Sequence, residues 1–363
     1  MYNFFSAAFG CAFFIDEEER VKKYRVAVVG AGAVGVEMIR VLKNRKFPME
    51  ELRVLARTER PLVVDGTTYQ VRVTTPEAFD NIDVALFAGT EGEKGAAVTF
   101  GKEAIARGAV VIDNGADFRM DPNVPLVVPE VNGDALKGHK GTVANPNCTT
   151  AVLLMGLAPL HRAFGVKRVV VSTYQAVSGA GGKAIEALRD QARKVLAGEP
   201  ITDLGGFPNP IAFNILANNW KIEEQGYSNE EWKVVKETHK MLDPKIQVSV
   251  TTVRVPTAVG HGESVWIETE KPITAAAARA VLAKAPGVRV VDEASPLDGV
   301  SCPMPILAAG REDTLVGRIR GDLFNDHALA FWVVGDNLWK GAALNAVQIA
   351  ETLIAKGWLK PNQ

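Results

Sequence analysis

YRVAVVGAGAVGVEMIRVLKNRKF, residues 24–47, decides the fold because its pattern changes at a glycine-rich turn. The stretch begins as a short β-rich run and ends with apolar side chains at helical spacing. Gly30, Gly32 and Gly35 satisfy G-x-G-x-x-G, in which the glycines make the turn, admit a pyrophosphate and let the helix pack. This order predicts dinucleotide binding, with a merely tight turn as the alternative. The residues expected to hold the cofactor here are Gly30, Gly32, Ala33, Val34 and Gly35.

The alternation of strands and helices continues up to residue 147. RVLAR (53–57) predicts a second strand, and Asp65-Gly66 lies between two β-like runs, as in a hairpin. DVALFAG, KGAAVTFGKEAIARG and AVVIDNG then predict a strand, a helix and another strand. Alternating elements of this kind build a parallel sheet. We therefore expect an α/β fold whose first unit, residues 24–147, is a Rossmann-type nucleotide-binding domain.

From about Val166 the pattern changes. VKRVVVSTYQAV, IQVSVTTVRVP, ESVWIETE and LVGRIRGDL alternate with a period of two in places, which predicts a largely antiparallel sheet with one wet or partner-covered face. We place this α+β catalytic and dimerisation domain at residues 148–335. The spacing of apolar residues over 336–358 predicts an amphipathic helix that ends at Gly357. We expect this helix to pack on the first domain and complete it.

The composition limits the class of partner. A net charge of −1 over 363 residues gives no global reason to expect nucleic acid or an anionic membrane. Three cysteines without a CxxC pair or a His/Cys cluster argue against disulfides and zinc, and fit a reducing cytosol. We therefore expect a cytoplasmic protein without a bound metal. Its partners would be small molecules and, because an open sheet must cover its apolar face, a second copy of the chain.

The N-terminal residues 1–23 need a separate interpretation. They contain the apolar run MYNFFSAAFGCAFFI, followed at once by acidic DEEER. The run lacks the positive start of a signal peptide and is shorter than the roughly 20 residues that a membrane helix needs. We expect a disordered or non-native extension, with a surface-docking segment as the alternative. Cys11 lies here and has no supporting constellation.

The choice of cofactor depends on the residues after the second strand. An acidic residue there binds the ribose hydroxyls of NAD, whereas basic residues hold the extra phosphate of NADP. This chain has Arg57, Thr58, Glu59 and Arg60. Two guanidinium groups and a hydroxyl favour NADP, because guanidinium forks match phosphate oxygens at two points. An ordinary charged loop containing Glu59 is the alternative.

Cys148 is the candidate nucleophile. In ANPNCTT (144–150) it stands at the seam between an Asn/Pro turn and an apolar helix. A helix N-terminus stabilises a thiolate through its dipole and its N–H donors. A small buried core residue is the alternative, although such a cysteine would fit better inside the helix. His261, between two glycines, is the candidate base, and Arg119, Lys233 and Arg254 could gather an anionic substrate.

Several longer motifs together resemble those of the aspartate-semialdehyde dehydrogenase family. The resemblance runs from about Tyr24 to Trp358. The motifs that carry it are PLVVPEVN (125–132), NPNCTT (145–150), TYQAVSGAGG (173–182), EEWKVVKET (230–238), VRVP with GHGESV, VGRIR (316–320) and DNLWKGAALNAVQIAE (336–351).

The resemblance implies a role for each matching residue. Cys148 would be the acyl-carrying nucleophile, His261 its acid/base partner, and Gln175 would orient the intermediate. Arg119 and Lys233 would bind the phosphate, Arg254 the α-carboxylate and Glu231 the α-ammonium. Asn147 would also belong to the substrate and phosphate site. The residues implied for the nicotinamide half of NADP are Ser178, Gly179 and Asn337.

The implied reaction is the NADP-dependent reductive dephosphorylation of L-4-aspartyl phosphate to L-aspartate 4-semialdehyde. A cysteine thioester divides this reaction into two easier steps. The product would serve the biosynthesis of lysine, diaminopimelate, threonine, methionine and isoleucine. The resemblance also implies a homodimer or a tetramer.

Three departures from the family pattern accompany the resemblance. The glycine turn is GAGAVG where the family commonly has GATGAVG, and DNGADFR puts Asp117 two places before Arg119. FAGTEGEKGA replaces the usual SAGG. Two other functions stay open: an N-acetylglutamyl-phosphate reductase, in which an acetylated amine would have no use for the acidic EEWK motif, and a non-catalytic NADP-binding homologue.

Overall fold

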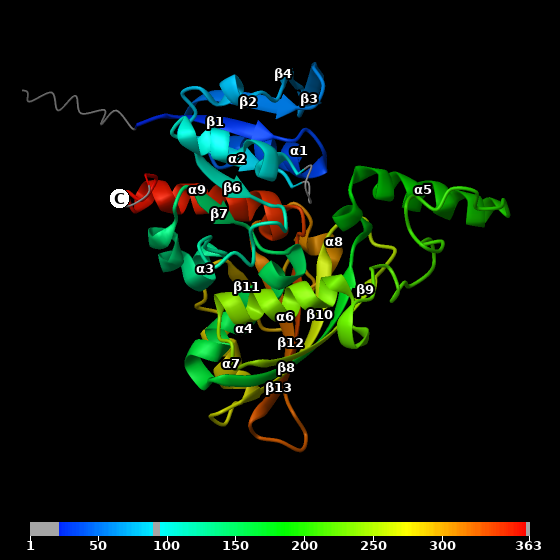
Figure 1. Ribbon diagram of the computed structural model, residues 1–363. Coiled ribbons are helices and arrows are strands. Elements are labelled where there is room, and N and C mark those ends of the chain that lie inside the picture. Colours follow the sequence, from blue (N-terminus) through cyan, green and yellow to red (C-terminus); the bar gives the residue numbers. More distant parts are fainter. Residues whose placement is uncertain (1–21, 90–94, 361–363) are drawn as a thin grey trace, which may run out of the picture.

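The computed structural model describes residues 22–89 and 95–360, which form two domains built on two sheets (Figure 1). The N-terminal extension, apart from its last two residues, therefore lies outside the described residues. The centre of FAGTEGEKGA also lies outside them. No helix in the described part of the chain is long and apolar enough to cross a membrane.

The first domain is a seven-stranded sheet with strand order β3-β4-β2-β1-β5-β6-β7. All neighbouring strands are parallel except the hairpin of β3 and β4, which turns at Asp65-Gly66. The strands are β1 (Tyr24–Val29), β2 (Met49–Ala56), β3 (Arg60–Val64), β4 (Thr67–Val73), β5 (Val84–Phe87), β6 (Val110–Asp113) and β7 (Thr142–Ala144). Its helices are α1 (Ala33–Asn44), η1 (Pro76–Phe79), α2 (Ala96–Ala106), α3 (Pro129–Asn132) and η2 (Gly133–Gly138).

The turn between β1 and α1 requires its glycines. Gly30 has a φ of +113°, which side chains rarely adopt, and a Cβ on Gly35 would lie 1.7 Å from the carbonyl oxygen of Gly30. Helix and strand can therefore approach closely only with glycine at position 35. The predicted strand, turn and helix are confirmed.

The second domain is a six-stranded sheet with strand order β11-β12-β13-β10-β8-β9. Its three central pairs are antiparallel, whereas the outer pairs β8 with β9 and β11 with β12 are parallel. The strands are β8 (Val166–Gln175), β9 (Gln247–Arg254), β10 (His261–Thr269), β11 (Val288–Val290), β12 (Thr314–Gly321) and β13 (Ala328–Gly335). The helices of this part are α4 (Cys148–Phe164), η3 (Val177–Ala180), α5 (Gly182–Ala197), η4 (Glu224–Gly226), α6 (Asn229–Met241), α7 (Ala275–Leu282) and α8 (Pro305–Ala308).

One face of this second sheet forms the larger core of the molecule. Helix α4 lies against it, with Leu153, Leu157 and Leu160 fully buried beside strand residues such as Val265 and Phe331. Complete burial of such side chains contributes roughly 1.5–3 kcal/mol each. The core therefore holds the start of α4 rigidly, and that start is where Cys148 lies.

The C-terminal segment returns to the first domain, as predicted. It is not one regular helix over 336–358: a π-helix, η5 (Trp339–Ala343), precedes α9 (Leu344–Ala355). Asp336 accepts hydrogen bonds from the backbone N–H groups of Leu338 and Trp339 and thereby starts the helical path. Leu344, Ile349 and other residues of α9 share a core with β1 and α1, and Figure 1 shows α9 beneath the first sheet.

Candidate active site

Asn147 caps α4 immediately before Cys148. Its side-chain oxygen accepts the N–H of Thr149 at 2.9 Å, which satisfies a donor of the first helical turn. Two carboxylates of α6 hold Asn147 in turn: Glu237 accepts its backbone N–H at 2.7 Å, and Glu230 accepts its amide N–H at 3.0 Å. The position of the cysteine is therefore set by a helix that lies far along the chain.

Burial raises the pKa of Cys148 to about 11, and the charge of Glu230 adds to the rise. The nearby guanidinium groups of Arg254 and Arg119 act in the opposite direction. The expectation that the helix terminus makes this sulfur a thiolate is wrong for the protein alone, because burial and a carboxylate outweigh the dipole. Burial therefore favours the thiol over the thiolate of Cys148 at neutral pH.

His261 faces this thiol at the start of β10. Its Nε2 lies 3.4 Å from the Sγ of Cys148, and its Nδ1 accepts the backbone N–H of Ala176 at 3.0 Å. A ring nitrogen that accepts a hydrogen bond carries no proton, so the neutral ring has its proton on Nε2, toward the sulfur. Burial and then Arg254 lower the pKa of His261 to about 3. The imidazole is therefore neutral and presents a donor to Cys148.

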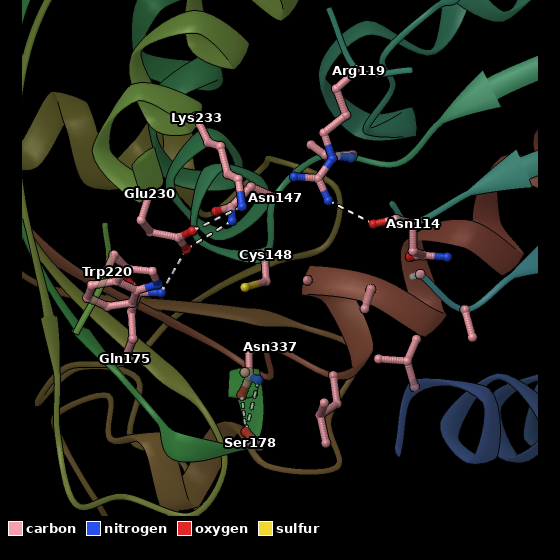
Figure 2. Close-up of a pocket in the computed structure, with 18 of the residues that line it drawn as sticks. Asn114, Arg119, Asn147, Cys148, Gln175, Ser178, Trp220, Glu230, Lys233 and Asn337 are labelled. Carbon is pink, nitrogen blue, oxygen red and sulfur yellow. Dashed lines mark hydrogen bonds and ion pairs between the residues drawn. The ribbon is translucent and has the colours of Figure 1, made fainter. Parts of the chain in front are cut away.

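A cavity of about 270 Å³ opens in front of the cysteine, and both domains contribute to its wall. Val34 and Ala88 come from the first domain, and Gln175 and Trp220 come from the second. Figure 2 shows Glu230 and Trp220 on one side of Cys148 and Arg119 on the other. A substrate in this cavity would meet the sulfur between two groups of charged side chains.

Arg119 and Lys233 line the cavity, as predicted from the sequence. The guanidinium of Arg119 is buried, forms an ion pair with Glu237 at 3.1 Å and donates to the carbonyl of Asn145 at 2.9 Å. Lys233 Nζ lies 3.6 Å from the carboxylate of Glu230. Asp117, the acidic neighbour noted in the sequence, is exposed.

Arg254 lies at the end of β9 and is 3% exposed. One terminal nitrogen donates to the carbonyl of Ala176 at 2.6 Å, and the ring of Trp220 lies 4.7 Å from the guanidinium carbon. Its Nε is buried without a partner among the described residues. A buried donor of this kind costs free energy unless a ligand satisfies it.

The acidic residue in the cavity is Glu230, not the predicted Glu231. Glu231 accepts the N–H of Ser228 at 2.7 Å and the N–H of Thr252 at 2.9 Å, and so both of its oxygens are used within the protein. With the Ser228 hydroxyl it forms a capping box at the start of α6. Glu230 lies in the wall of the cavity, and it rather than Glu231 is positioned to meet an ammonium group.

Gln175, Ser178, Gly179 and Asn337 also line the cavity. Gln175 donates to Glu230 at 3.1 Å. Ser178 and Asn337 are hydrogen-bonded side chain to side chain at 3.0 Å. A Cβ on Gly179 would lie 3.0 Å from the Nη1 of Arg254, so a side chain there would crowd the arginine.

The glycine turn opens toward this cavity. Gly32 caps α1 without a side-chain hydrogen bond, and a Cβ added to Gly32 would meet nothing within 4 Å. The N–H groups of the first turn, which include those of Ala33 and Val34, can therefore receive an anion, and Val34 itself lines the cavity. The turn, although one residue shorter than the common family form, fits a pyrophosphate.

The basic residues after β2 are exposed at the edge of this turn. Arg60 donates to the Thr58 hydroxyl at 3.3 Å and to the carbonyl of Ala31 at 3.3 Å, which joins the two loops. Arg57 and Glu59 are also exposed. The loop therefore presents two guanidinium groups next to the predicted nucleotide site.

The residues that sequence reasoning missed include Glu230, Trp220 and Gly341 in the wall of the cavity, and Glu237 behind Asn147. A signal existed for Glu230 and Glu237. Ser228 followed three residues later by Glu231 is the pattern of a capping box, which assigns Glu231 to the helix start. Positions 230, 233 and 237 then share one helix face. Trp220 and Gly341 carried no such signal.

The fold and the site define the class of two-domain semialdehyde dehydrogenases. The family model described as "Semialdehyde dehydrogenase, NAD binding domain" matches residues 25–139, and "Semialdehyde dehydrogenase, dimerisation domain" matches residues 157–340. The curated aspartate-semialdehyde dehydrogenase of Aquifex aeolicus is 48% identical over 92% of this chain and 99% of its own length. That of Bacillus subtilis is 43% identical over 90% of this chain and 96% of its own length.

Comparison with solved structures points to the same family as the curated relatives. The crystal structure of aspartate semialdehyde dehydrogenase II of Vibrio cholerae, complexed with ASA, has a TM-score of 0.86 and 39% identity, over 92% of this chain and 99% of that chain. The chain belongs to the aspartate-semialdehyde dehydrogenase family. The N-acetylglutamyl-phosphate alternative is not favoured, because the relatives carry the name of the aspartate enzyme.

Proposed function

We propose that the protein interconverts L-4-aspartyl phosphate and L-aspartate 4-semialdehyde, with NADP as the hydride carrier and a thioester on Cys148 as the intermediate. The observation that carries the proposal is a thiol 3.4 Å from an imidazole nitrogen at a cavity with an acidic group and three cations. The product would enter the biosynthesis of lysine, threonine, methionine and isoleucine.

The charges of the cavity match the substrate. Arg254 offers a buried donor to the α-carboxylate, and Glu230 offers a carboxylate to the α-ammonium. Arg119 and Lys233 provide positive charge for the phosphate. A free ammonium group would give the buried Glu230 a further charged partner, whereas an acetylated amine carries no charge to offer it.

In the biosynthetic direction the sulfur of Cys148 attacks the acyl carbon, and phosphate leaves with the electron pair of the broken C–O bond and with the proton of the thiol. The nicotinamide, when bound, supplies the hydride that reduces the thioester carbon. The resulting oxyanion reforms a carbonyl group, the C–S bond breaks, and its electron pair returns to sulfur. The aldehyde is thereby released, and the sulfur takes up a proton from water, which returns the protein to its starting form.

His261 supports each negative charge in this sequence. Its Nε2–H faces the sulfur, so it can donate to the thiolate and to the oxyanion that develops beside it. The sequence predicted an acid/base partner, and the bond from Ala176 to Nδ1 favours a hydrogen-bond donor in that place. The amide of Gln175, fixed by Glu230, can orient the same oxygen.

The proposal is tested by measuring NADP reduction with aspartate semialdehyde and inorganic phosphate. We expect phosphate-dependent turnover, no turnover after Cys148→Ala, and roughly a 10²-fold loss after His261→Asn, because an oxyanion donor is removed. N-acetylglutamate semialdehyde assayed in parallel should react far more slowly. Equal rates with both aldehydes, or turnover by the Cys148→Ala variant, would contradict the proposal.

NADP in preference to NAD rests on the two guanidinium groups at positions 57 and 60. Changing Arg57 and Arg60 together to Gln should raise the KM for NADP by about 10-fold or more, because charge-assisted bonds to the 2′-phosphate are lost. Activity with NAD should stay within about twofold. An unchanged ratio of kcat/KM for the two cofactors would refute the assignment.

We also propose a homodimer built on the second sheet, consistent with the match to a dimerisation domain over residues 157–340. The face of this sheet opposite α4 leaves Val170 and Tyr174 partly exposed, at 40% and 37%. A partner subunit would cover this apolar surface.

A further inference from the structure

The indole of Trp220 forms one wall of the cavity. Its ring lies 4.7 Å from the guanidinium carbon of Arg254, within the range of a cation–π contact. Figure 2 shows it beside Gln175 and below Glu230. Trp220 belongs to the long connection between α5 and α6, which contributes no other residue to the wall.

Backbone contacts on both sides fix the position of Trp220. Four residues before it, Leu216 exchanges two backbone hydrogen bonds of 2.9 Å with Arg254 itself. Directly after it, the carbonyl of Lys221 accepts the N–H of Asn229, the first residue of α6, at 2.8 Å. Leu216 is also buried in a small apolar cluster with Phe207. The backbone on both sides of Trp220 is therefore anchored, which favours the contact of its indole with the arginine.

Two contacts restrict the approach of a ligand to the guanidinium. Trp220 covers one face, and the carbonyl of Ala176 occupies one terminal nitrogen. The Nε–H edge is buried and has no partner among the described residues. Carboxylates bind guanidinium groups in the plane through such N–H edges. Excluding water from that edge strengthens the charge pair.

We propose that Trp220 determines the preference of this site for aldehydes that carry a free carboxylate, by shielding Arg254 from water. This inference rests on the proposed function, because it names how that site recognises its substrate. An aldehyde without a carboxylate gains nothing from the shielded arginine. Trp220 thus contributes to binding of the carboxylate and not to the chemistry at Cys148.

The test compares aspartate semialdehyde with 3-aminopropanal, which keeps the ammonium group but lacks the carboxylate, in the same phosphate-dependent assay. In Trp220→Ala the ratio of kcat/KM for the two aldehydes should fall by roughly tenfold. The fall should come from a higher KM for aspartate semialdehyde, with kcat within about twofold and the values for 3-aminopropanal unchanged. Trp220→Phe, which retains an aromatic face, should restore most of the ratio.

Trp232→Leu is the matched control, because this indole contacts Tyr227 and Lys236 outside the cavity. Its ratio should equal that of the unaltered protein. Equal losses for both aldehydes in Trp220→Ala, or an unchanged ratio, would overturn the inference.

A second measurement separates this inference from the proposed function. Alkylation of Cys148 by iodoacetate, which carries a carboxylate, is compared with alkylation by neutral iodoacetamide. Trp220→Ala should lower the ratio of the two rates roughly tenfold, and an unchanged ratio would count against the role of Trp220. If the unaltered protein fails to oxidise aspartate semialdehyde, the proposed function fails, while the alkylation ratio still decides the inference.

Discussion

Glu230 and Glu237 lie at the N-terminus of α4. The N-terminus of a helix ordinarily favours an anion. Glu237 is paired with Arg119, and Glu230 is close to Lys233, so each carboxylate has a cation on its far side. The charge felt by the sulfur is set by this network and by burial, and therefore the thiol form prevails. No pattern within residues 144–150 contains that information, because both carboxylates come from another helix.

The first prediction concerns the reactivity of Cys148. Its alkylation by iodoacetamide should rise with pH toward about 11, because the thiolate forms as the pH passes through the pKa. Glu230→Gln removes a negative charge that raises this pKa, so alkylation at pH 8 should be several-fold faster. Mass spectrometry of the peptide containing Cys148 measures the rate.

Cys302 in the same digest is the internal control, because it lies outside the cavity and its rate should not change. Equal rates at Cys148 in the variant and in the unaltered protein would show that Glu230 has no influence on the thiol.

At the scale of elements, the π-helix η5 brings its backbone against Cys148, the proposed nucleophile. A Cβ on Gly341 would lie 2.6 Å from the Cβ of Cys148 and 3.1 Å from its Cα. Lys340, the preceding residue, is buried and donates to Glu130 at 2.6 Å, and so holds the wide turn in place. The amphipathic spacing of residues 336–358 predicted the helix but not its irregular first turn, because tertiary contacts and not periodicity produce it.

Gly341→Ala should therefore reduce kcat by 10²-fold or more, because the methyl group must displace Cys148 from its place beside His261. Gly138→Ala is a suitable comparison, since a Cβ there would meet nothing within 4 Å. Steady-state assays with circular dichroism spectra measure both activity and folding. A fully active Gly341→Ala variant would mean that η5 does not constrain the cysteine.

At the scale of the whole molecule, the sequence predicted both sheets, their domains and the return of the C-terminal helix. The two sheets and the C-terminal helix follow from local periodicity. The nucleotide-binding domain follows from a glycine turn that fits only one arrangement of strand and helix. The meeting of Trp220, Glu230 and Arg254 could not be predicted, because these residues lie on separate elements joined by a long irregular connection. Only tertiary packing decides which of their faces turns toward Cys148.

The proposed dimer gives a prediction at this scale. Val170→Glu places a charge on the partly exposed face of the second sheet, so the particle should become a monomer when measured by light scattering after size-exclusion chromatography. Val63→Glu, at a position 65% exposed on β3, should leave the mass of the unaltered protein unchanged. A dimer that persists in Val170→Glu would place the interface elsewhere.

Both passages of the chain between the domains occur at the proposed catalytic pair, Cys148 and His261. The chain leaves β7 at Ala144 and reaches Cys148 after three residues, and it leaves β13 at Gly335, the strand partner of His261. Any rocking of the first sheet relative to the second must pivot close to these two passages. Points near a pivot move least, so sulfur and imidazole would stay together while the nucleotide turn swings open to exchange its cofactor.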